Sequence, residues 1–393
     1  MVRGIPSLFP ELESPQEQVG LPQTPHASGV LPSQAIRELI NAGCISAETP
    51  ILEEQIQPAT IDLRLGPVAY RVRASFLPGS LSTASEKMEC ILMNELDLTK
   101  PTVFEVGCVY IVPLLERLSL PPGVYGKANP KSSTGRLDVF TRLITDYGTQ
   151  FDQVTENYKG RLYAEVVPRT FSVRLQQGIK LSQLRFLRGN ARPSDAKLNE
   201  INKNDKLVYD EEKPAKAQID EGLQISINLE SNGDSGIIGY RAKRHAPVID
   251  IEKVGHYDSE EFWEVVHVPK TKGIILDPGD FYILGSREKI RVPPAYAAEL
   301  KPFDASLGEF RVHYAGFFDP GFGYGKNDIK GTKAVLEVRA HDVPSLLEHG
   351  QAIGKLEYTR LLEPSDKVYG VGIKSSYQTQ TLALSKHFRK SPE

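Results

Sequence analysis

Short apolar runs alternate with turn residues along most of the chain. Segments such as 161–167 (RLYAEVV) and 333–339 (KAVLEVR) are rich in Val, Leu, Ala and Tyr, and Pro-Pro, Pro-Gly and Asp-Pro-Gly sequences separate such segments. This arrangement is typical of half-buried β-strands joined by tight turns. We therefore predict a mainly β protein.

One clear helix interrupts this pattern, in residues 33–43 (SQAIRELINAG). Its Ile and Leu residues fall on one face at helical spacing. Ser33 is in position to cap the start of the helix, and Gly43 is in position to end it. Elsewhere the pattern predicts only a few short helices.

The two halves of the chain repeat one pattern. Tyr110 corresponds to Tyr282 (282 − 110 = 172), and Glu165 corresponds to Glu337 at the same offset (337 − 165 = 172). An offset that stays nearly constant over such a distance indicates a duplicated domain. We expect two tandem β-barrel or jelly-roll domains.

These observations predict five parts along the chain. They are a mobile N-terminal arm (1–28), a first domain (29–189), a charged connector (190–221), a second domain (222–365) and a C-terminal phosphate lid or tail (366–393). The two domains are called the first unit and the second unit below.

The composition argues against several classes of protein. A net charge of −3 gives no reason to expect a nucleic-acid or membrane partner. No apolar run approaches the roughly 20 residues that span a bilayer, and the N-terminus lacks the apolar core of a signal peptide. Cys44, Cys90 and Cys108 are scattered and lack zinc-site spacing, so we interpret them as buried free thiols in a reducing cytoplasm.

The segment 130–136 (PKSSTGR) combines two cations, three hydroxyl groups and a glycine. Hydroxyls, turn amides and flanking cations suit phosphate oxygens, because they supply directional donors and neutralise charge. The candidate phosphate-binding residues are Lys131, Ser132, Ser133 and Arg136. A surface turn with a solvated arginine would explain the same residues.

Two features of the second unit could complete such a site. In 313–325 (HYAGFFDPGFGYG), aromatic residues surround Asp319, and glycines allow close approach of the backbone. This is first of all a turn signal, but a hairpin of this kind could hold a flat ring while Asp319 takes a sugar hydroxyl. Glu337 lies among apolar residues, so its pKa would rise and it could move a proton. An edge-strand glutamate that faces solvent is the alternative.

The C-terminal stretch 369–380 (YGVGIKSSYQTQ) is rich in glycine and in hydrogen-bond donors. Such a segment could close as a lid over a charged ligand. A frayed terminus is the alternative interpretation.

Together these stretches resemble the deoxycytidine triphosphate deaminase family, which has the trimeric dUTPase-like fold. QPATIDLRLG (57–66) is similar to the family's first motif, and KSSTGR (131–136) is similar to its phosphate motif. AGFFDPGF (315–322) looks like its nucleoside hairpin, Glu337 like its catalytic glutamate, and SSYQTQ (375–380) like its C-terminal phosphate lid. Five motifs in this order make the resemblance specific, and it extends over both units.

The two units have lost different parts of this pattern. The second unit has DASLGE (304–309) at the phosphate motif, where Glu309 would repel phosphate, and the first unit has TDYGTQFDQ (145–153) in place of the hairpin. Sites in this family lie between subunits. The resemblance therefore implies one composite site, with the phosphate motif from the first unit and the hairpin and Glu337 from the second.

The resemblance implies hydrolytic deamination of dCTP to dUTP and ammonia without zinc, feeding dUMP and dTTP synthesis. Mg²⁺ would enter with the triphosphate. The implied catalytic residues are Glu337, Arg136 and Ser132, with Glu165 as second choice for the carboxylate, and the implied substrate-binding residues are Lys131, Ser133, Ala315, Phe317, Asp319, Lys374, Tyr377 and Gln380. A dUTP diphosphatase, a bifunctional dUMP-forming enzyme and a non-catalytic nucleotide sensor are the alternatives. The chain could also form a homo-oligomer.

Overall fold

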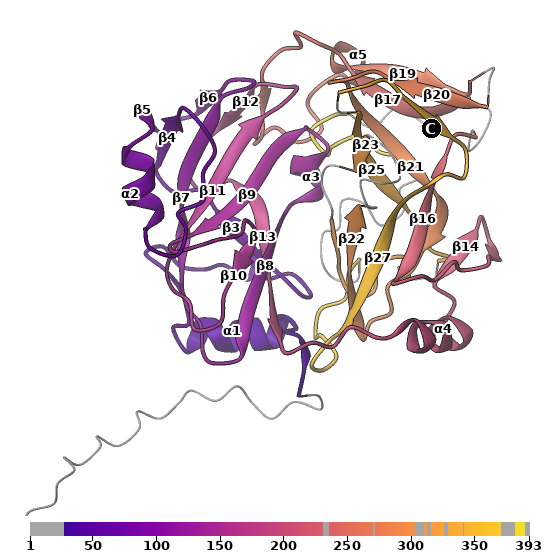
Figure 1. Ribbon diagram of the computed structural model, residues 1–393, viewed down its shortest axis with the longest axis horizontal. Coiled ribbons are helices and arrows are strands. Elements are labelled where there is room, and N and C mark those ends of the chain that lie inside the picture. Colours follow the sequence, from indigo (N-terminus) through magenta and orange to yellow (C-terminus); the bar gives the residue numbers. More distant parts are fainter. Residues whose placement is uncertain are drawn as a thin grey trace, which may run out of the picture.

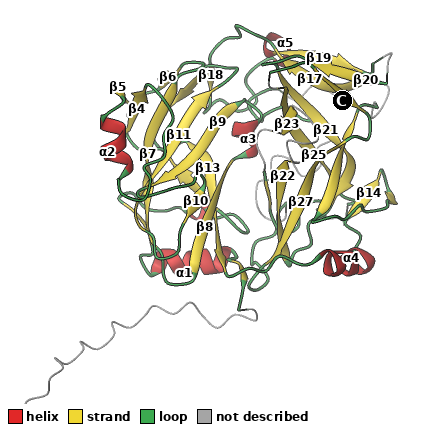
Figure 2. Ribbon diagram, viewed as in Figure 1, coloured by secondary structure: helices red, strands yellow, loops and turns green. Residues whose placement is uncertain are grey.

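The computed structural model describes residues 27–230, 236–269, 272–302, 310–312, 316–325, 329–340, 342–370 and 382–389. Strands dominate this part of the chain (Figure 2), and its longest α-helix has 10 residues. The prediction of a mainly β protein with a few short helices is confirmed. The predicted N-terminal arm and most of the predicted lid lie outside the described residues.

The first unit contains two larger antiparallel sheets around one core, and two of its strands belong to a third, 3-stranded sheet. Its elements are β1 (Gly29–Val30), α1 (Ser33–Asn41), β2 (Ile45–Ala47), a 3-10 turn (Glu53–Gln55), β3 (Ile61–Arg64), β4 (Val68–Val72), α2 (Ala84–Glu89), β5 (Leu92–Asp97), β6 (Thr102–Phe104), β7 (Val109–Ser119), β8 (Val124–Pro130), α3 (Ser132–Gly135), β9 (Val139–Thr145), β10 (Gln153–Val154), β11 (Lys159–Pro168), β12 (Val173–Leu175) and β13 (Lys180–Arg188). One sheet is built on β13 and β8, and the other on β7 and β11. Leu63, Val112 and Phe186 are buried between them.

After a short connecting region, the second unit repeats the strand pairing of the first, but most of its strands are joined in one 11-stranded sheet. The elements from the connector onward are α4 (Asp195–Asn204), β14 (Val208–Asp210), β15 (Lys213–Pro214), β16 (Leu223–Asn228), β17 (Ile237–Ala242), β18 (Ile249–Asp250), α5 (Ser259–Phe262), β19 (Trp263–His267), β20 (Gly273–Leu276), β21 (Phe281–Ile290), β22 (Tyr296–Pro302), β23 (Phe310–Val312), β24 (Phe317–Phe318), β25 (Thr332–Ala340), β26 (Ser345–Glu348) and β27 (Ala352–Arg360). Its core contains Ile225, Leu284, Leu336 and Leu356.

Strand register confirms the repeat. Glu165 lies opposite Ile111 in the β7–β11 pair, and Glu337 lies opposite Ile283 in the β21–β25 pair. The two glutamates and the two isoleucines are each separated by the same offset (337 − 165 = 172 and 283 − 111 = 172). The duplication seen in the sequence is therefore a duplication of strand pairing.

The start of α1 differs from the sequence prediction. Pro32 occupies the N-cap position, and Ser33 is already helical. The Ser33 hydroxyl lies 2.8 Å from the hydroxyl of Ser365, so it anchors the C-terminal segment and does not cap the helix. The other end is as predicted, because Gly43 has a φ of 73° that favours glycine.

The connector is more ordered than its charged sequence suggested. Ser194 caps α4 by accepting a hydrogen bond from the Lys197 amide (3.3 Å), and Leu198 is buried in the core of the second unit. The Asp195 carboxylate accepts hydrogen bonds from the backbone amides that precede β16. Leu207 and Val208 are buried in the same core, and β14 pairs with β21, so this segment is packed on the second unit.

The two units lie side by side, with α3 at their boundary (Figure 1). β18 of the second unit pairs in parallel with β12 of the first. Phe171 of the first unit packs edge-on against Phe262 and Trp263 of the second, with ring centroids 5.7 and 5.4 Å apart. The units therefore share one hydrophobic interface.

The cysteines are only partly as expected. All three are free thiols, but only Cys44 is buried, whereas Cys90 is exposed and Cys108 is half-buried. Cys90 directly follows α2, at the molecular surface. Among the described residues, no helix combines the length and the apolar character needed to cross a membrane.

Candidate active site

The segment 130–136 forms a compact helical turn after β8. The amides of Thr134 and Gly135 donate to the carbonyl of Lys131 (2.8 and 3.0 Å), which closes α3. Arg136 then points back along this turn, and its Nε donates to the Ser132 hydroxyl (3.1 Å). Arg136 is only 2% exposed, so this segment is not a surface turn with a solvated arginine.

The segment 316–325 of the second unit forms the predicted turn. β24 pairs with β22, and the chain then reverses through Asp319, Pro320 and Gly321. Gly321 has a φ of 89°, which a residue with a side chain would adopt only under strain. The ring of Phe322 packs edge-on against Phe318 (4.9 Å), so the turn presents a fixed aromatic surface.

Glu337 lies in β25, which pairs with β21 and β23. All nine residues of β25 are buried, so the expectation of a half-buried strand is wrong here. Burial of Glu337 raises the pKa of its carboxyl to about 8, while the nearby Arg136 acts in the opposite direction. The strand is buried on both faces because the first unit covers one of them.

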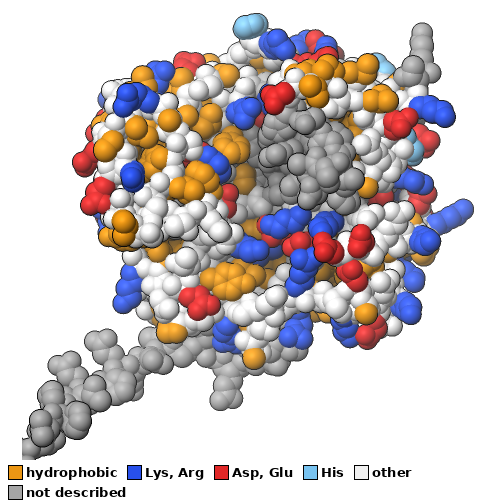
Figure 3. All heavy atoms as spheres, viewed as in Figure 1, with side chains coloured by type: hydrophobic (Ala, Val, Ile, Leu, Met, Phe, Trp, Pro, Cys, Tyr) orange, Lys and Arg blue, Asp and Glu red, His pale blue; other side chains and the backbone are white. Residues whose placement is uncertain are grey.

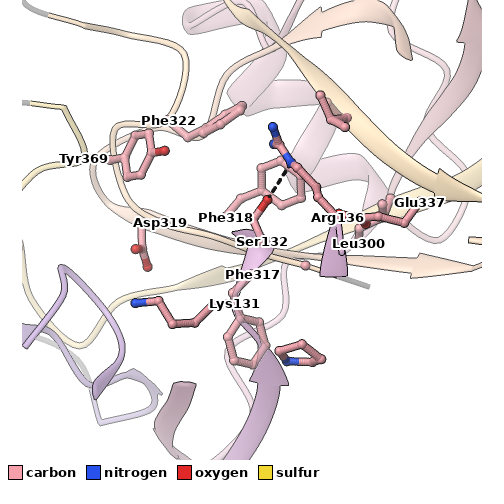
Figure 4. Close-up of a pocket in the computed structure, with 14 residues that line it drawn as sticks. Lys131, Ser132, Arg136, Leu300, Phe317, Phe318, Asp319, Phe322, Glu337 and Tyr369 are labelled. Atoms are coloured by element: carbon pink, nitrogen blue, oxygen red, sulfur yellow. Dashed lines mark hydrogen bonds between the residues drawn. The ribbon is translucent and has the colours of Figure 1, made fainter. Parts of the chain in front are cut away.

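One cleft brings these groups together within a single chain. In Figure 4, Ser132 and Arg136 lie between Asp319 on one side and Glu337 on the other. The residues that line the cleft are Pro130, Lys131, Ser132, Arg136, Leu300, Gly316, Phe317, Phe318, Asp319, Phe322, Ala334, Val335, Glu337 and Tyr369. The first unit contributes the cations and the hydroxyl, and the second unit contributes the carboxyls and the aromatic rings.

One buried ion pair and one partly exposed ion pair link the two units beside the cleft. Arg339 of the second unit forms an ion pair with Asp138 of the first and donates to the Thr170 hydroxyl (2.9 Å). On the face shown in Figure 3, side chains of both charges gather where β22 lies in Figure 1. Glu299 of β22 lies 3.7 Å from Lys127 of β8.

Two charged residues that the sequence did not single out as site residues lie beside Asp319. Asp62, in β3, forms an ion pair with Lys131, and Arg185, in β13, lies 3.7 Å from Asp319. Burial raises the pKa of Asp319 to about 6, Arg185 and Lys131 lower it, and Asp62 raises it. One feature of the sequence could have pointed to Arg185 as a site residue, namely a charge within an apolar strand. Arg185 follows Leu184 and precedes Phe186.

Glu165, the second choice for the catalytic carboxylate, lies outside the cleft. It is fully buried, and its Oε1 accepts hydrogen bonds from Arg142 Nη2 and Nε (2.6 and 3.1 Å). The guanidinium of Arg142 in turn lies 3.5 Å from the centre of the Phe151 ring. The charge of Glu165 is thus compensated by Arg142 of the same unit.

The counterpart of the hairpin in the first unit is not 145–153, as the sequence suggested. Lys127 and Glu299 are equivalent positions in β8 and β22 (299 − 127 = 172). Gln153 lies opposite Lys127, and Phe317 lies opposite Glu299. The equivalent strands are therefore β10 and β24, and the offset between them is smaller (317 − 153 = 164).

Two compensating insertions concealed this relationship. The first unit has extra residues before β10, and the second has GKNDIKGT (325–332) after its hairpin. The offset therefore returns to 172 at Glu337. Thr155 occupies the position of Asp319, which means that the first unit lacks the hairpin carboxylate.

The remaining predicted residues fall into two groups. Ser133 is buried and does not line the cleft, and its carbonyl accepts a hydrogen bond from the Ser385 hydroxyl (2.8 Å). Ala315, Lys374, Tyr377 and Gln380, like DASLGE (304–309), lie outside the described residues. Within the described ranges, no group of three or more His, Cys, Asp or Glu side chains could hold a metal ion.

Family models match both units. The model for the N-terminal domain of 2′-deoxycytidine 5′-triphosphate deaminase (DCD) matches residues 27–190, and the model for its C-terminal domain matches residues 194–388. The chain belongs to the DCD family. The tandem duplication therefore corresponds to the family's N- and C-terminal domains.

A solved member of the DCD family matches the whole fold. The crystal structure of 2′-deoxycytidine 5′-triphosphate deaminase from Agrobacterium tumefaciens is 46% identical in sequence, with a TM-score of 0.82. The match covers 86% of this chain and 100% of that chain. The arrangement of both units is thus shared with a known dCTP deaminase.

More distant relatives match one part of the chain. The dCTP deaminase of Halorubrum lacusprofundi is 29% identical over 147 residues, which are 37% of this chain and 66% of the relative. The dUMP-forming dCTP deaminase of Corynebacterium glutamicum is 29% identical over 151 residues, 36% of this chain and 76% of the relative. The chain thus spans about two thirds to three quarters of the length of these relatives.

Proposed function

We propose that the chain is a dCTP deaminase that hydrolyses dCTP to dUTP and ammonia at the cleft between its two units. The observation that carries this proposal is that Ser132 and Arg136 share one cleft with Asp319 and Glu337. Membership of the DCD family and the match to the Agrobacterium tumefaciens enzyme support the same activity. Each chain would form one complete site.

Glu337 is the proposed proton carrier. Because its pKa is raised to about 8, roughly a tenth of the molecules carry the ionised form at pH 7. The ionised carboxylate takes a proton from the water whose oxygen attacks C4 of cytosine, and passes this proton to N3. Glu337 then takes the remaining proton from the hydroxyl on C4 and delivers it to the exocyclic nitrogen. The C4–N bond breaks, ammonia leaves, and the oxygen on C4 becomes the carbonyl of uracil.

Arg136 and Ser132 are proposed to position the water and stabilise the tetrahedral centre. Because the Ser132 hydroxyl oxygen accepts a hydrogen bond from Arg136 Nε, its own hydrogen is available for the water or the substrate. The Arg136 guanidinium is held further by the carbonyl of Ala383, to which Nη1 donates (2.9 Å). Donors fixed before the reaction stabilise developing charge without reorganisation.

The rest of the cleft suits a deoxynucleoside triphosphate. Phe317, Phe318 and Phe322 offer an aromatic wall for the base, and Asp319 offers an acceptor for the sugar. Lys131 would meet the phosphates, together with Lys374, Tyr377 and Gln380 of the predicted lid. Mg²⁺ would arrive bound to phosphate oxygens and is assigned no protein ligand. We place the reaction in the cytoplasm, where the exposed Cys90 thiol would stay reduced.

The experiment is incubation of the pure protein with dCTP and Mg²⁺, with ammonia and pyrophosphate assayed together. Ammonia without pyrophosphate is the expected result. Both products together would identify a dUMP-forming enzyme. Pyrophosphate released in a parallel incubation with dUTP, with no ammonia from dCTP, would identify a diphosphatase. Tight dCTP binding without either product would identify a nucleotide sensor and refute the proposal.

A further inference from the structure

Arg185 is a buried cation that reaches from the first unit into the second. It lies in β13 between Leu184 and Phe186, which are both fully buried, and its own side chain is 4% exposed. Burial lowers the pKa of the Arg185 guanidinium, which means that the site destabilises its charge. A charge in such a position persists only where specific partners compensate for the lost hydration.

Among the described residues, the partners of Arg185 lie in β22 and in the hairpin that bears Asp319. Arg185 Nη1 donates to the carbonyl of Ala298 in β22 (3.0 Å), and Nη2 donates to the carbonyl of Phe318 in β24 (3.3 Å). The guanidinium also lies 4.0 Å from the centre of the Phe317 ring. One planar side chain therefore contacts both β22 and β24 and also stacks on one ring of the hairpin.

The hydrogen bonding of the Asp319 carboxylate, beside Arg185, is incomplete. Asp319 Oδ1 lies 3.7 Å from Arg185 Nη2, too far for a direct hydrogen bond. Among the described residues this buried oxygen has no hydrogen-bond partner. A buried acceptor left without a donor is costly, and here it faces a cleft that a ligand can enter.

We propose that Arg185 is a positioning residue that orients Asp319 toward the 3′-hydroxyl of the substrate. Arg185 thereby determines the selectivity for nucleotides that carry a 3′-hydroxyl. This inference rests on the proposed function. A deoxynucleoside triphosphate has only one free sugar hydroxyl, on C3′, because the 5′ oxygen carries the phosphates. That hydroxyl donates to Asp319 Oδ1. Among the described residues, the charged groups that act on the carboxyl of Asp319 are Arg185 from β13, Asp62 from β3 and Lys131 after β8. Because Lys131 is paired with Asp62, Arg185 is, of these groups, the cation that compensates the charge of Asp319.

The test compares dCTP with 2′,3′-dideoxycytidine triphosphate, which lacks the 3′-hydroxyl. The ratio of their kcat/KM values is measured for the wild type, Arg185→Gln and Arg185→Lys. In the wild type we expect a ratio of at least about 10, since a hydrogen bond to a charged acceptor is lost with the analogue. In Arg185→Gln the ratio falls to about 1 to 3, mainly through a higher KM for dCTP. Arg185→Lys, which keeps the charge but not the planar fork, lowers the ratio at least severalfold.

Arg142→Gln is the matched control, because Arg142 is also largely buried, stacked on aromatic rings and paired with a carboxylate, but lies outside the cleft. It should leave the ratio unchanged even if it destabilises the fold. An Arg185 variant that slows both nucleotides equally, or that keeps the wild-type ratio, overturns the inference and leaves Arg185 as a structural link. If the wild type releases no ammonia from dCTP, the proposed function itself fails; the same ratio is then read from the dissociation constants of the two nucleotides.

Discussion

Arg339 and Asp138 form a buried ion pair across the boundary between the two units. Each lies two residues from a proposed catalytic side chain, since Glu337 precedes Arg339 and Arg136 precedes Asp138. The pair therefore fixes the relative position of an acid–base group and its cationic partner, although neither member lines the cleft. Because the two residues are 201 positions apart, this link exists only in the folded chain.

Asp138→Asn should reduce both stability and turnover. Loss of one partner leaves Arg339 buried without its counter-charge, which destabilises the fold by about 3–5 kcal/mol. Small displacements of Glu337 relative to Arg136 should lower kcat at least about tenfold. Denaturant unfolding and steady-state kinetics measure both effects. Arg241→Gln breaks a solvent-exposed ion pair with Glu264 and is the control, with an expected change below about 1 kcal/mol.

The two equivalent glutamates should respond differently to the same substitution. Glu337→Gln should abolish deamination and leave dCTP binding largely intact, because the amide cannot carry a proton between water and the leaving nitrogen. Glu165→Gln should retain catalysis by the folded protein, because Glu165 is paired with Arg142 outside the cleft. Ammonia release and calorimetric titration with dCTP distinguish them. Full activity in Glu337→Gln would reassign the catalytic carboxylate.

The rate should increase with pH over the neutral range. Glu337, with a pKa of about 8, must be ionised to take a proton, and Asp319, with a pKa of about 6, must be ionised to hold the sugar. The logarithm of kcat/KM should therefore rise with a slope near 1 between pH 6 and 8, more steeply below pH 6, and level off above pH 8. A profile that is flat from pH 6 to 8 would contradict the proton-transfer role of Glu337.

Stability should change with pH in the opposite direction. The pKa of Glu337 is higher in the folded protein than in the unfolded chain, so its contribution to stability is fully present below about pH 4.5 and is lost as the pH rises through about 8. Glu337→Gln removes this loss, and it should be more stable than the wild type at pH 9 by roughly 3–5 kcal/mol. Urea unfolding at pH 5 and pH 9 tests this. Equal stability differences at both pH values would show that Glu337 is not held protonated by burial.

The fold and most of the cleft residues could be predicted from the sequence, because both depend on local patterns. Strand-like runs and a repeat offset of 172 predict the two units, and Ser132, Arg136, Asp319 and Glu337 each lie in a recognisable motif. The complementary losses in the two units then indicate that these motifs meet.

Other features depend on register or on long-range packing, which one sequence does not reveal. The equivalence of Thr155 with Asp319 was hidden by two insertions that cancel in the offset. The sequence shows Arg185 only as a charge within an apolar run, and it is the packing of the neighbouring unit that makes it a buried partner of the hairpin. Ser33 looked like a helix cap, but a segment more than 300 residues away competes for its hydroxyl.

The most direct test of a site formed within one chain is complementation between two inactive variants. Arg136→Ala removes the contribution of the first unit, and Glu337→Gln removes that of the second. The two proteins are mixed, unfolded together in urea, refolded and assayed for ammonia release from dCTP. We predict activity no higher than that of either variant alone, because every chain lacks one half of its own cleft. Recovery of a substantial fraction of wild-type activity, up to about a quarter if chains pair at random, would show that the cleft is assembled between chains and would contradict the account.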